Sequence, residues 1–234
     1  MGAEELSGGS VSLRHEYISL KRNGAGSYGG GQQWSRDKTM VRCGCGVIAG
    51  LDVLLYMRRN SPGCGGIPFA PGENGRRIPD SVYYSYAERL RKWLPLIPGR
   101  GINGLMLAGG LELFFLRCGL PYTIRWGVLS GSLFASIERM LRADLPVILA
   151  VGPNFPRFWR DDKLPLYTRT PDGEYRPCGA AKAHYVVVTG MDGEWLHISS
   201  WGREYYINRR EYLAYGKAHS LPVLNSIAVI SPRR

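Results

Sequence analysis

The stretch Cys43-Gly44-Cys45-Gly46-Val47-Ile48-Ala49 opens an apolar segment that ends before the turn signal Asn60-Ser61-Pro62-Gly63. Its apolar residues recur at helical spacing, which predicts a helix over 45–57 with Cys45 at its start. A thiol becomes a useful nucleophile when it is held as a thiolate, and a helix N-terminus favours that state. Cys45 is therefore the candidate nucleophile. Cys43 is the alternative, although its context lacks the pattern of a helix start.

A second segment, Ala183-His184-Tyr185-Val186-Val187-Val188-Thr189-Gly190, begins nearly 140 residues after Cys45. Its β-branched run predicts a strand over 184–190. An imidazole beside a thiol can act as a base, and as an imidazolium it favours the thiolate. His184 is therefore the candidate base, and a thiol paired with it predicts an enzyme.

The sequence Met191-Asp192-Gly193-Glu194 that follows is a hairpin signal. With Asp192-Gly193 as the turn, we expect Met191 to pair with Glu194 and the second strand to cover 195–200. Counting outward from that pair puts four side chains on one face of the hairpin: His184, His197, Ser199 and Trp201. Ser199 is then the polar partner of His184, and Trp201 lines the cleft and shields the ring. A register slip of one residue would bring Ser200 to His184 instead.

The remaining pattern is helical in the first half and strand-like in the second. Helices are expected over 80–94, over 104–118 with Asn103 as the cap, and from Ser130 or Ser132 to about 142. Further strands are expected within 11–20 and over 122–128, 146–151, 204–207 and 223–230. A short helix is expected over 209–215. Long loops are expected over 60–79 and 152–182. This segregation predicts an α+β fold. We expect one domain over 1–234, with a mainly helical lobe in 1–121 that includes an N-terminal extension, a mainly antiparallel sheet lobe in 122–234, and a cleft between them.

Composition limits the partners that we expect. The 234 residues carry a net charge of +11, but the basic residues are dispersed and form no nucleic-acid motif, which indicates a solvated basic surface and no nucleic-acid partner. The longest apolar runs are too short to span a bilayer, and the acidic start Met1-Gly2-Ala3-Glu4-Glu5 is unlike a secretion signal. We therefore expect a protein of the cytoplasm without a membrane span.

The five cysteines form no C-x-x-C pair, which favours a reduced protein without a structural metal. The alternative is a secreted protein with one or two disulfides and a free catalytic thiol. A zinc site built from His184, His197 and a cysteine would lack the usual ligand spacing. We expect neither a metal nor another cofactor.

Several blocks together resemble the papain-like cysteine peptidases, and among them the C39-like branch related to bacteriocin-leader peptidases. The blocks are Cys45-Gly46-Val47-Ile48-Ala49, the segment 133–151, the strand that begins at His184, Ser199-Ser200-Trp201-Gly202, and Arg210-Glu211-Tyr212-Leu213. The resemblance covers roughly residues 40–230 and implies a papain-like α+β fold in which Cys45 and His184 cleave peptide bonds. It places Ser199 where the family has Asn or Asp. It also requires an oxyanion-hole glutamine, for which Gln33 is the candidate, with Gln32 beside it.

The expected function is therefore a cysteine peptidase-like thiol hydrolase acting on a peptide or protein. Similar residues also serve acyltransferases, deamidases and transglutaminase-like enzymes, and the missing Asn or Asp suits a catalytically inactive peptide-binding pseudo-enzyme. The loops over 60–79 and 152–182 are expected to flank the cleft and set specificity. Asn154 is a candidate for the cleft wall, and four charged residues of the second loop are candidates for selecting a charged ligand: Arg157, Arg160, Asp161 and Asp162. The oligomeric state is left open.

Overall fold

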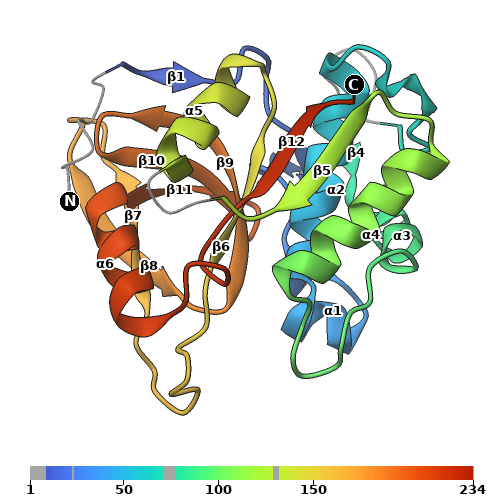
Figure 1. The fold of residues 1–234 in the computed structure, drawn as a ribbon. Helices are drawn as coiled ribbons and strands as arrows, with labels where there is room; N and C mark the ends of the chain where they lie inside the picture. The colour runs from blue at the N-terminus through green and yellow to red at the C-terminus, as the bar shows by residue number, and fades with distance from the viewer. Residues whose placement is uncertain (1–8, 23, 71–76, 129–131, 234) are drawn as a thin grey trace.

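The computed structural model describes residues 9–22, 24–70, 77–128 and 132–233. Ser130, residues 71–76 of the predicted loop over 60–79, and the first five residues lie outside this part. Four helices, α1 to α4, gather on one side of the molecule, and the main antiparallel sheet with α5 and α6 makes up the other side (Figure 1). This arrangement confirms the predicted α+β class.

The helical side consists of α1 (Lys38–Cys43), α2 (Cys45–Asn60), α3 (Asp80–Arg91) and α4 (Gly104–Arg117). As predicted, α2 begins at Cys45, and all of its residues over 46–57 are buried. A helix that is apolar on every face is typically surrounded by protein, and α2 packs against α3 and the main sheet. The predicted cap of α4 is also present, because the Asn103 side chain accepts a hydrogen bond from the backbone N–H of Met106. Two short 3₁₀ turns, η1 (Gln32–Trp34) and η2 (Cys64–Gly66), flank α1 and α2.

The main sheet is organised around β9 (His184–Asp192), which has neighbours along both edges. Along one edge, β6 (Val147–Val151) pairs with the first half of β9 and β1 (Val11–Ser12) pairs near its end. On the other edge the order continues through β10 (Trp195–Ser200), β11 (Arg203–Asn208), β7 (Leu164–Arg169) and β8 (Tyr175–Ala181). The strand that begins with His184 is therefore the best-supported strand of the sheet.

One predicted element is wrong and two have different bounds. The expected loop over 152–182 contains the β7–β8 hairpin, whose outer strand is exposed and includes Pro177 and Gly179, so it carries no alternating apolar pattern. The expected strand within 11–20 is reduced to β1 and the start of β2 (Leu20–Arg22), which pairs with β3 (Ala25–Gly26) and β4 (Ile78–Pro79). The last strand begins only at Ala228, as β12 (Ala228–Pro232), and pairs with β5 (Tyr122–Trp126) in a separate two-stranded sheet.

Two helices cover the sheet side, α5 (Leu133–Arg142) and α6 (Arg209–His219). The first packs on β1, β6, β9 and β12, and the second packs on β7 and β11. Across the described part of the chain, no helix combines the length and the apolar character that crossing a bilayer requires.

Gly46 brings the first turn of α2 directly against β9. A Cβ atom at this position would lie only 2.8 Å from Ile102 Cγ2 and 3.2 Å from the ring of Tyr185. The Tyr185 hydroxyl in turn donates a hydrogen bond to the Ile102 carbonyl at 3.0 Å. Because Gly46 follows Cys45 and Tyr185 follows His184, this close contact sets the position of one candidate residue relative to the other.

A buried carboxylate ties the N-terminal segment to the helical side. Asp52 of α2 accepts hydrogen bonds from the Tyr83 hydroxyl at 2.6 Å, the Gly30 N–H at 3.0 Å and the Tyr17 hydroxyl at 3.3 Å. Burial raises the pKa of Asp52 to about 6, and these three donors oppose the shift. Gly30 also accepts a hydrogen bond from the N–H of Gly202, just after β10. The segment that leads into η1 is thereby held between α2 and the end of β10.

Candidate active site

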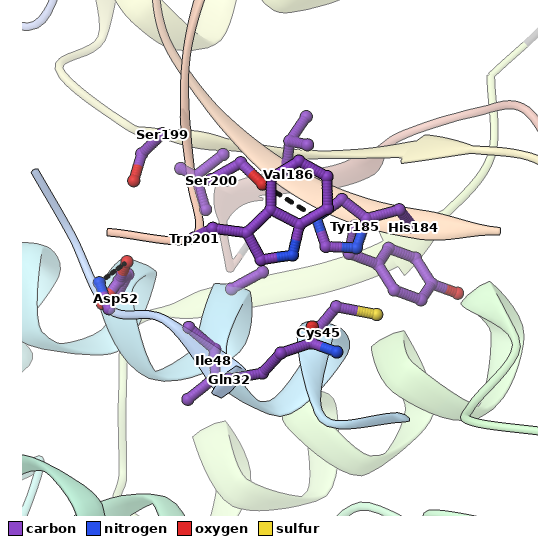
Figure 2. A pocket seen from close by; sticks show the side chains of 13 residues that line it. Gln32, Cys45, Ile48, Asp52, His184, Tyr185, Val186, Ser199, Ser200 and Trp201 are labelled. Atoms are coloured by element: carbon purple, nitrogen blue, oxygen red, sulfur yellow. Dashed lines mark hydrogen bonds between the residues drawn. The ribbon is translucent and has the colours of Figure 1, made fainter. Parts of the chain in front are cut away.

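Cys45 and His184 line the same narrow pocket, between the start of α2 and the start of β9 (Figure 2). The N-terminal segment contributes Gly30 and Gln32 to this pocket, α2 contributes Asp52, and the end of β10 contributes Ser199, Ser200 and Trp201. The cavity volume is about 10 Å³, which is room for one water molecule at most. Both side chains therefore line a space with little room for water, where a charge is costly unless it is paired.

The Cys45 side chain projects from the first turn of α2 toward β9. Burial raises the pKa of the Cys45 thiol, and hydrogen bonding to the backbone N–H groups of Tyr185 and Gly46 lowers it in part. The helix start and the strand thus each supply a donor to the sulfur. Desolvation is the larger effect, so the thiol is neutral at neutral pH, whereas the sequence led us to expect a thiolate.

His184 is buried and has one nitrogen occupied. Its Nε2 is 2.8 Å from Ser200 Oγ, and the Trp201 ring stacks on the imidazole with centroids 4.4 Å apart and planes 18° from parallel. Burial lowers the pKa of His184 to about 4. Within the described residues, Nδ1 has no hydrogen-bond partner. A proton from a neighbouring thiol would be accepted at this nitrogen.

The hairpin register that we predicted is wrong, and the error changes the partner of His184. Asp192 pairs with Trp195, so near the turn the register is shifted by two residues from the prediction. A bulge then leaves Thr189 unpaired, between the His197↔Gly190 and Ile198↔Val188 pairs. Past the bulge the register differs from the prediction by one residue. Because side chains alternate along a strand, Ser200 and not Ser199 shares a face with His184.

Ser199 and His197 face the other side of the hairpin. The Ser199 hydroxyl donates to the Tyr28 carbonyl at 2.8 Å, next to Asp52 and Gly29. The His197 ring stacks between Tyr28 and Tyr206, and its Nε2 lies beside the Glu204 carboxylate. Ser199 therefore anchors the N-terminal segment, and His197 is held away from His184, which removes the basis of the zinc alternative.

Of the two adjacent glutamines, the structure brings Gln32 to the pocket. Its Nε2 donates to the Val41 carbonyl at 2.9 Å, and its Oε1 is buried without a hydrogen-bond partner in the described structure. Gln33, the predicted residue, instead donates to the Trp201 carbonyl at 2.9 Å and does not line the pocket. An amide has two N–H donors, so Gln32 retains one that the bond to Val41 does not use. Sequence spacing could not separate the two glutamines, because the tether at Gly30 decides which one lines the pocket.

A larger cleft of about 700 Å³ begins where the pocket ends. His184 and Tyr185 line both spaces. One wall of the cleft is the segment between α3 and α4, with Arg100, Ile102 and Gly104, and the other wall comes from the end of β6 and the segment after it, with Val151 and Phe158. The cleft is mainly apolar, and it is large enough to bind several residues of a peptide.

Asn154 does not line this cleft, contrary to the prediction. Its side chain is buried, and its Nδ2 donates to the carbonyls of Arg160 at 2.8 Å and Asp162 at 3.2 Å. It borders a separate cavity beside the end of α6. Its role is to brace the loop that follows β6. Asp52 lines the pocket and was not among the predicted residues, although a single acidic residue inside an apolar helix is a visible signal.

All five cysteines lie in the described part of the chain, and each carries a free thiol. Cys43 is buried at the end of α1. Among the residues with described positions, no group of three or more His, Cys, Asp or Glu side chains is placed to hold a metal ion.

No family model matches the chain, and no curated protein matches it either. Among solved structures, the chain is similar to a protein from Bacillus anthracis described as a "putative C39-like peptidase". The TM-score is 0.48 with 13% sequence identity, and the match covers 97% of this chain and 100% of that chain. A likeness this distant carries no conclusion about activity, which must be judged from the site itself.

The ionisation of the pair predicts how the thiol reacts. Because burial raises the pKa of Cys45 and lowers that of His184 to about 4, both groups are neutral from weakly acidic to neutral pH. We expect alkylation of Cys45 by iodoacetamide to be slow at about pH 5–6 and to accelerate above about pH 8. Mass spectrometry of the Cys45 peptide gives the rate, with exposed Cys178 as the internal reference. Fast alkylation at about pH 5–6 would instead reveal a thiolate–imidazolium pair.

Proposed function

We propose that the protein is a cysteine hydrolase that cleaves peptide or amide bonds with Cys45 as the nucleophile and His184 as the base. The observation that carries the proposal is the Ser200 contact. It occupies Nε2 of His184 and leaves Nδ1 free in the pocket that holds the thiol at the start of α2. The cleft of about 700 Å³, which shares His184 and Tyr185 with this pocket, supplies the place for a peptide.

The reaction begins from a neutral pair. With the proton of His184 on Nε2, where it is donated to Ser200, the free Nδ1 takes the proton of the Cys45 thiol as the sulfur attacks the substrate carbonyl carbon. The C–S bond forms, and the carbonyl oxygen becomes an oxyanion. The imidazolium then gives its Nδ1 proton to the departing amine as the C–N bond breaks. Water, deprotonated by the same nitrogen, hydrolyses the thioester and restores the thiol.

Two polar side chains support these steps without reacting themselves. Ser200 is a positioning residue, because its hydroxyl fixes the orientation of the His184 ring and can accept the Nε2 proton in the tautomer that the proposed reaction uses. The free N–H of Gln32 is the proposed donor to the oxyanion. A serine adds no negative charge beside the imidazole, so the imidazolium is less stabilised than it would be beside a carboxylate.

The same observation favours a second candidate, a peptide-binding protein without turnover. A neutral thiol, a His184 pKa of about 4 and an uncharged partner are what a site that has lost its catalytic ion pair would show. Such a protein would bind peptides in the cleft without cleaving them. The products that form therefore distinguish the hydrolase from the binding protein.

Hydrolysis is tested with a peptide library in water enriched in heavy oxygen. The wild-type protein is expected to yield new carboxyl termini that carry the heavy isotope, detected by mass spectrometry. Cys45→Ala is expected to yield none, and Cys43→Ala, which removes the buried thiol of α1, is expected to retain activity. Products joined to an amine would identify a transferase. Binding of peptides by the wild type without any product would identify the inactive candidate.

The neighbouring serines provide a matched pair of substitutions. Ser200→Ala is expected to lower kcat/KM roughly tenfold, because the imidazole loses one oriented hydrogen bond. Ser200→Thr, which keeps the hydroxyl, is expected to restore most of the rate and the pH profile. Ser199→Ala makes the same chemical change on the opposite face and is expected to lower the free energy of unfolding by about 1 kcal/mol with little effect on kcat/KM. A large loss of kcat/KM in Ser199→Ala together with little loss in Ser200→Ala would refute the register described above.

The adjacent glutamines provide a second pair. Gln32→Ala is expected to lower kcat by roughly a hundredfold, since it removes a donor to the oxyanion, while KM changes little. Gln33→Ala removes only the hydrogen bond to the Trp201 carbonyl and is expected to leave kcat within a factor of about three. Steady-state kinetics with a cleaved peptide measures both. Equal losses in the two variants would mean that the segment is needed only for folding.

A further inference from the structure

The loop between β6 and β7 displays three aromatic side chains to solvent. Phe155, Phe158 and Trp159 are 39%, 62% and 81% exposed, all within a segment of five residues. We name residues 155–160 the aromatic tip. In Figure 1 the loop that contains it extends below the body of the protein. Aromatic side chains this exposed are unusual in a protein that functions free of any surface.

The loop is braced at its base, so the exposure of the tip does not result from a lack of contacts. Asn154 donates to the Arg160 and Asp162 carbonyls, and the Lys182 ammonium group also donates to the Arg160 carbonyl at 2.9 Å. Phe155 and Phe158 pack edge to face with centroids 5.5 Å apart. Several hydrogen bonds thus hold the loop in a conformation that directs aromatic rings away from the core.

The charges around the tip have a positive balance. Both acidic residues of the loop are paired with basic side chains: Asp161 with Lys163 and Lys182, and Asp162 with Arg160. Arg157, within the tip, and Arg100, on the facing wall of the cleft, form no ion pair with any residue of described position. The whole chain carries a net charge of +11. The surface that surrounds the exposed rings is therefore basic.

We propose that the aromatic tip docks the protein on an anionic lipid bilayer, with Phe158 and Trp159 inserted among the headgroups and Arg157 against lipid phosphates. Aromatic rings interspersed with arginine are the composition of membrane-interface segments. The loop that contains the tip protrudes from the body of the protein (Figure 1), so it can reach a soft surface that deforms around it. Phe158 also lines the cleft, so docking would place the mouth of the cleft at the membrane. This inference does not depend on turnover.

Sedimentation with vesicles tests the proposal on the full chain carrying Cys45→Ala, which excludes cleavage. The protein is expected to bind vesicles of phosphatidylcholine mixed with phosphatidylglycerol, to bind pure phosphatidylcholine far more weakly, and to dissociate as salt is added. The double change Phe158→Ser and Trp159→Ser is expected to weaken binding roughly tenfold or more, and Arg157→Gln roughly fivefold. Trp159 fluorescence should shift to shorter wavelength on binding, and that shift should vanish in the double variant.

Two control variants match these changes elsewhere on the surface. Leu113→Ser removes an equally exposed apolar side chain from α4, and Arg176→Gln removes an exposed charge at the far end of the β7–β8 hairpin. Both are expected to bind vesicles as the parent does. Absence of binding to anionic vesicles, unchanged binding by the tip variants, or a loss caused by Leu113→Ser alone would overturn the proposal. So would binding of an acidic polypeptide in place of vesicles.

Discussion

The site depends on the close approach of α2 to β9 at Gly46 and Tyr185. Only a residue without a side chain allows this approach, since a Cβ at position 46 would overlap Ile102. The contact lies one residue from Cys45 on the helix and one residue from His184 on the strand, so both reactive groups are positioned by backbone packing. Hydrogen bonds flank this contact: the Asp52 carboxylate accepts from the Gly30 N–H, and the Tyr185 hydroxyl donates to the Ile102 carbonyl.

The electrostatics of the pocket follow from the same packing. Because α2 and β9 meet so closely, water is excluded, and exclusion of water raises the pKa of the thiol and lowers that of the imidazole. The hydroxyl of Ser200 orients the ring without compensating for the lost solvation. In the proposed reaction, charge separation would be supported by the substrate and by three donors around the pair: the N–H groups of Tyr185 and Gly46 and the amide of Gln32. These pKa shifts would favour transfer of a proton during attack over a stored ion pair.

Local signals in the sequence were sufficient for the elements that carry the chemistry. The apolar periodicity from Cys45, the Asn103 cap and the β-branched run after His184 each act within a few residues, and each element formed as predicted. The register of β10 was not predictable in this way, because the bulge at Thr189 is associated with a hydrogen bond from Tyr28, 161 residues away in the sequence. The position of Gln32 likewise depends on Asp52 and Gly202, which hold Gly30 from two distant parts of the chain.

Two spaces of very different size adjoin at His184. The pocket of Cys45 and His184 has a volume of about 10 Å³ and the cleft beside it about 700 Å³, so a peptide bound by the proposed hydrolase would place most of its atoms in the cleft. One wall of the cleft comes from the segment between α3 and α4 and the other from the segment after β6. Ile102 belongs to the first wall and also contacts Gly46, so a change at Ile102 would disturb the approach of α2 to β9. Phe158 connects the cleft to the exposed tip, because its ring belongs to both, so whatever surface the tip meets also lies at the entrance for the substrate.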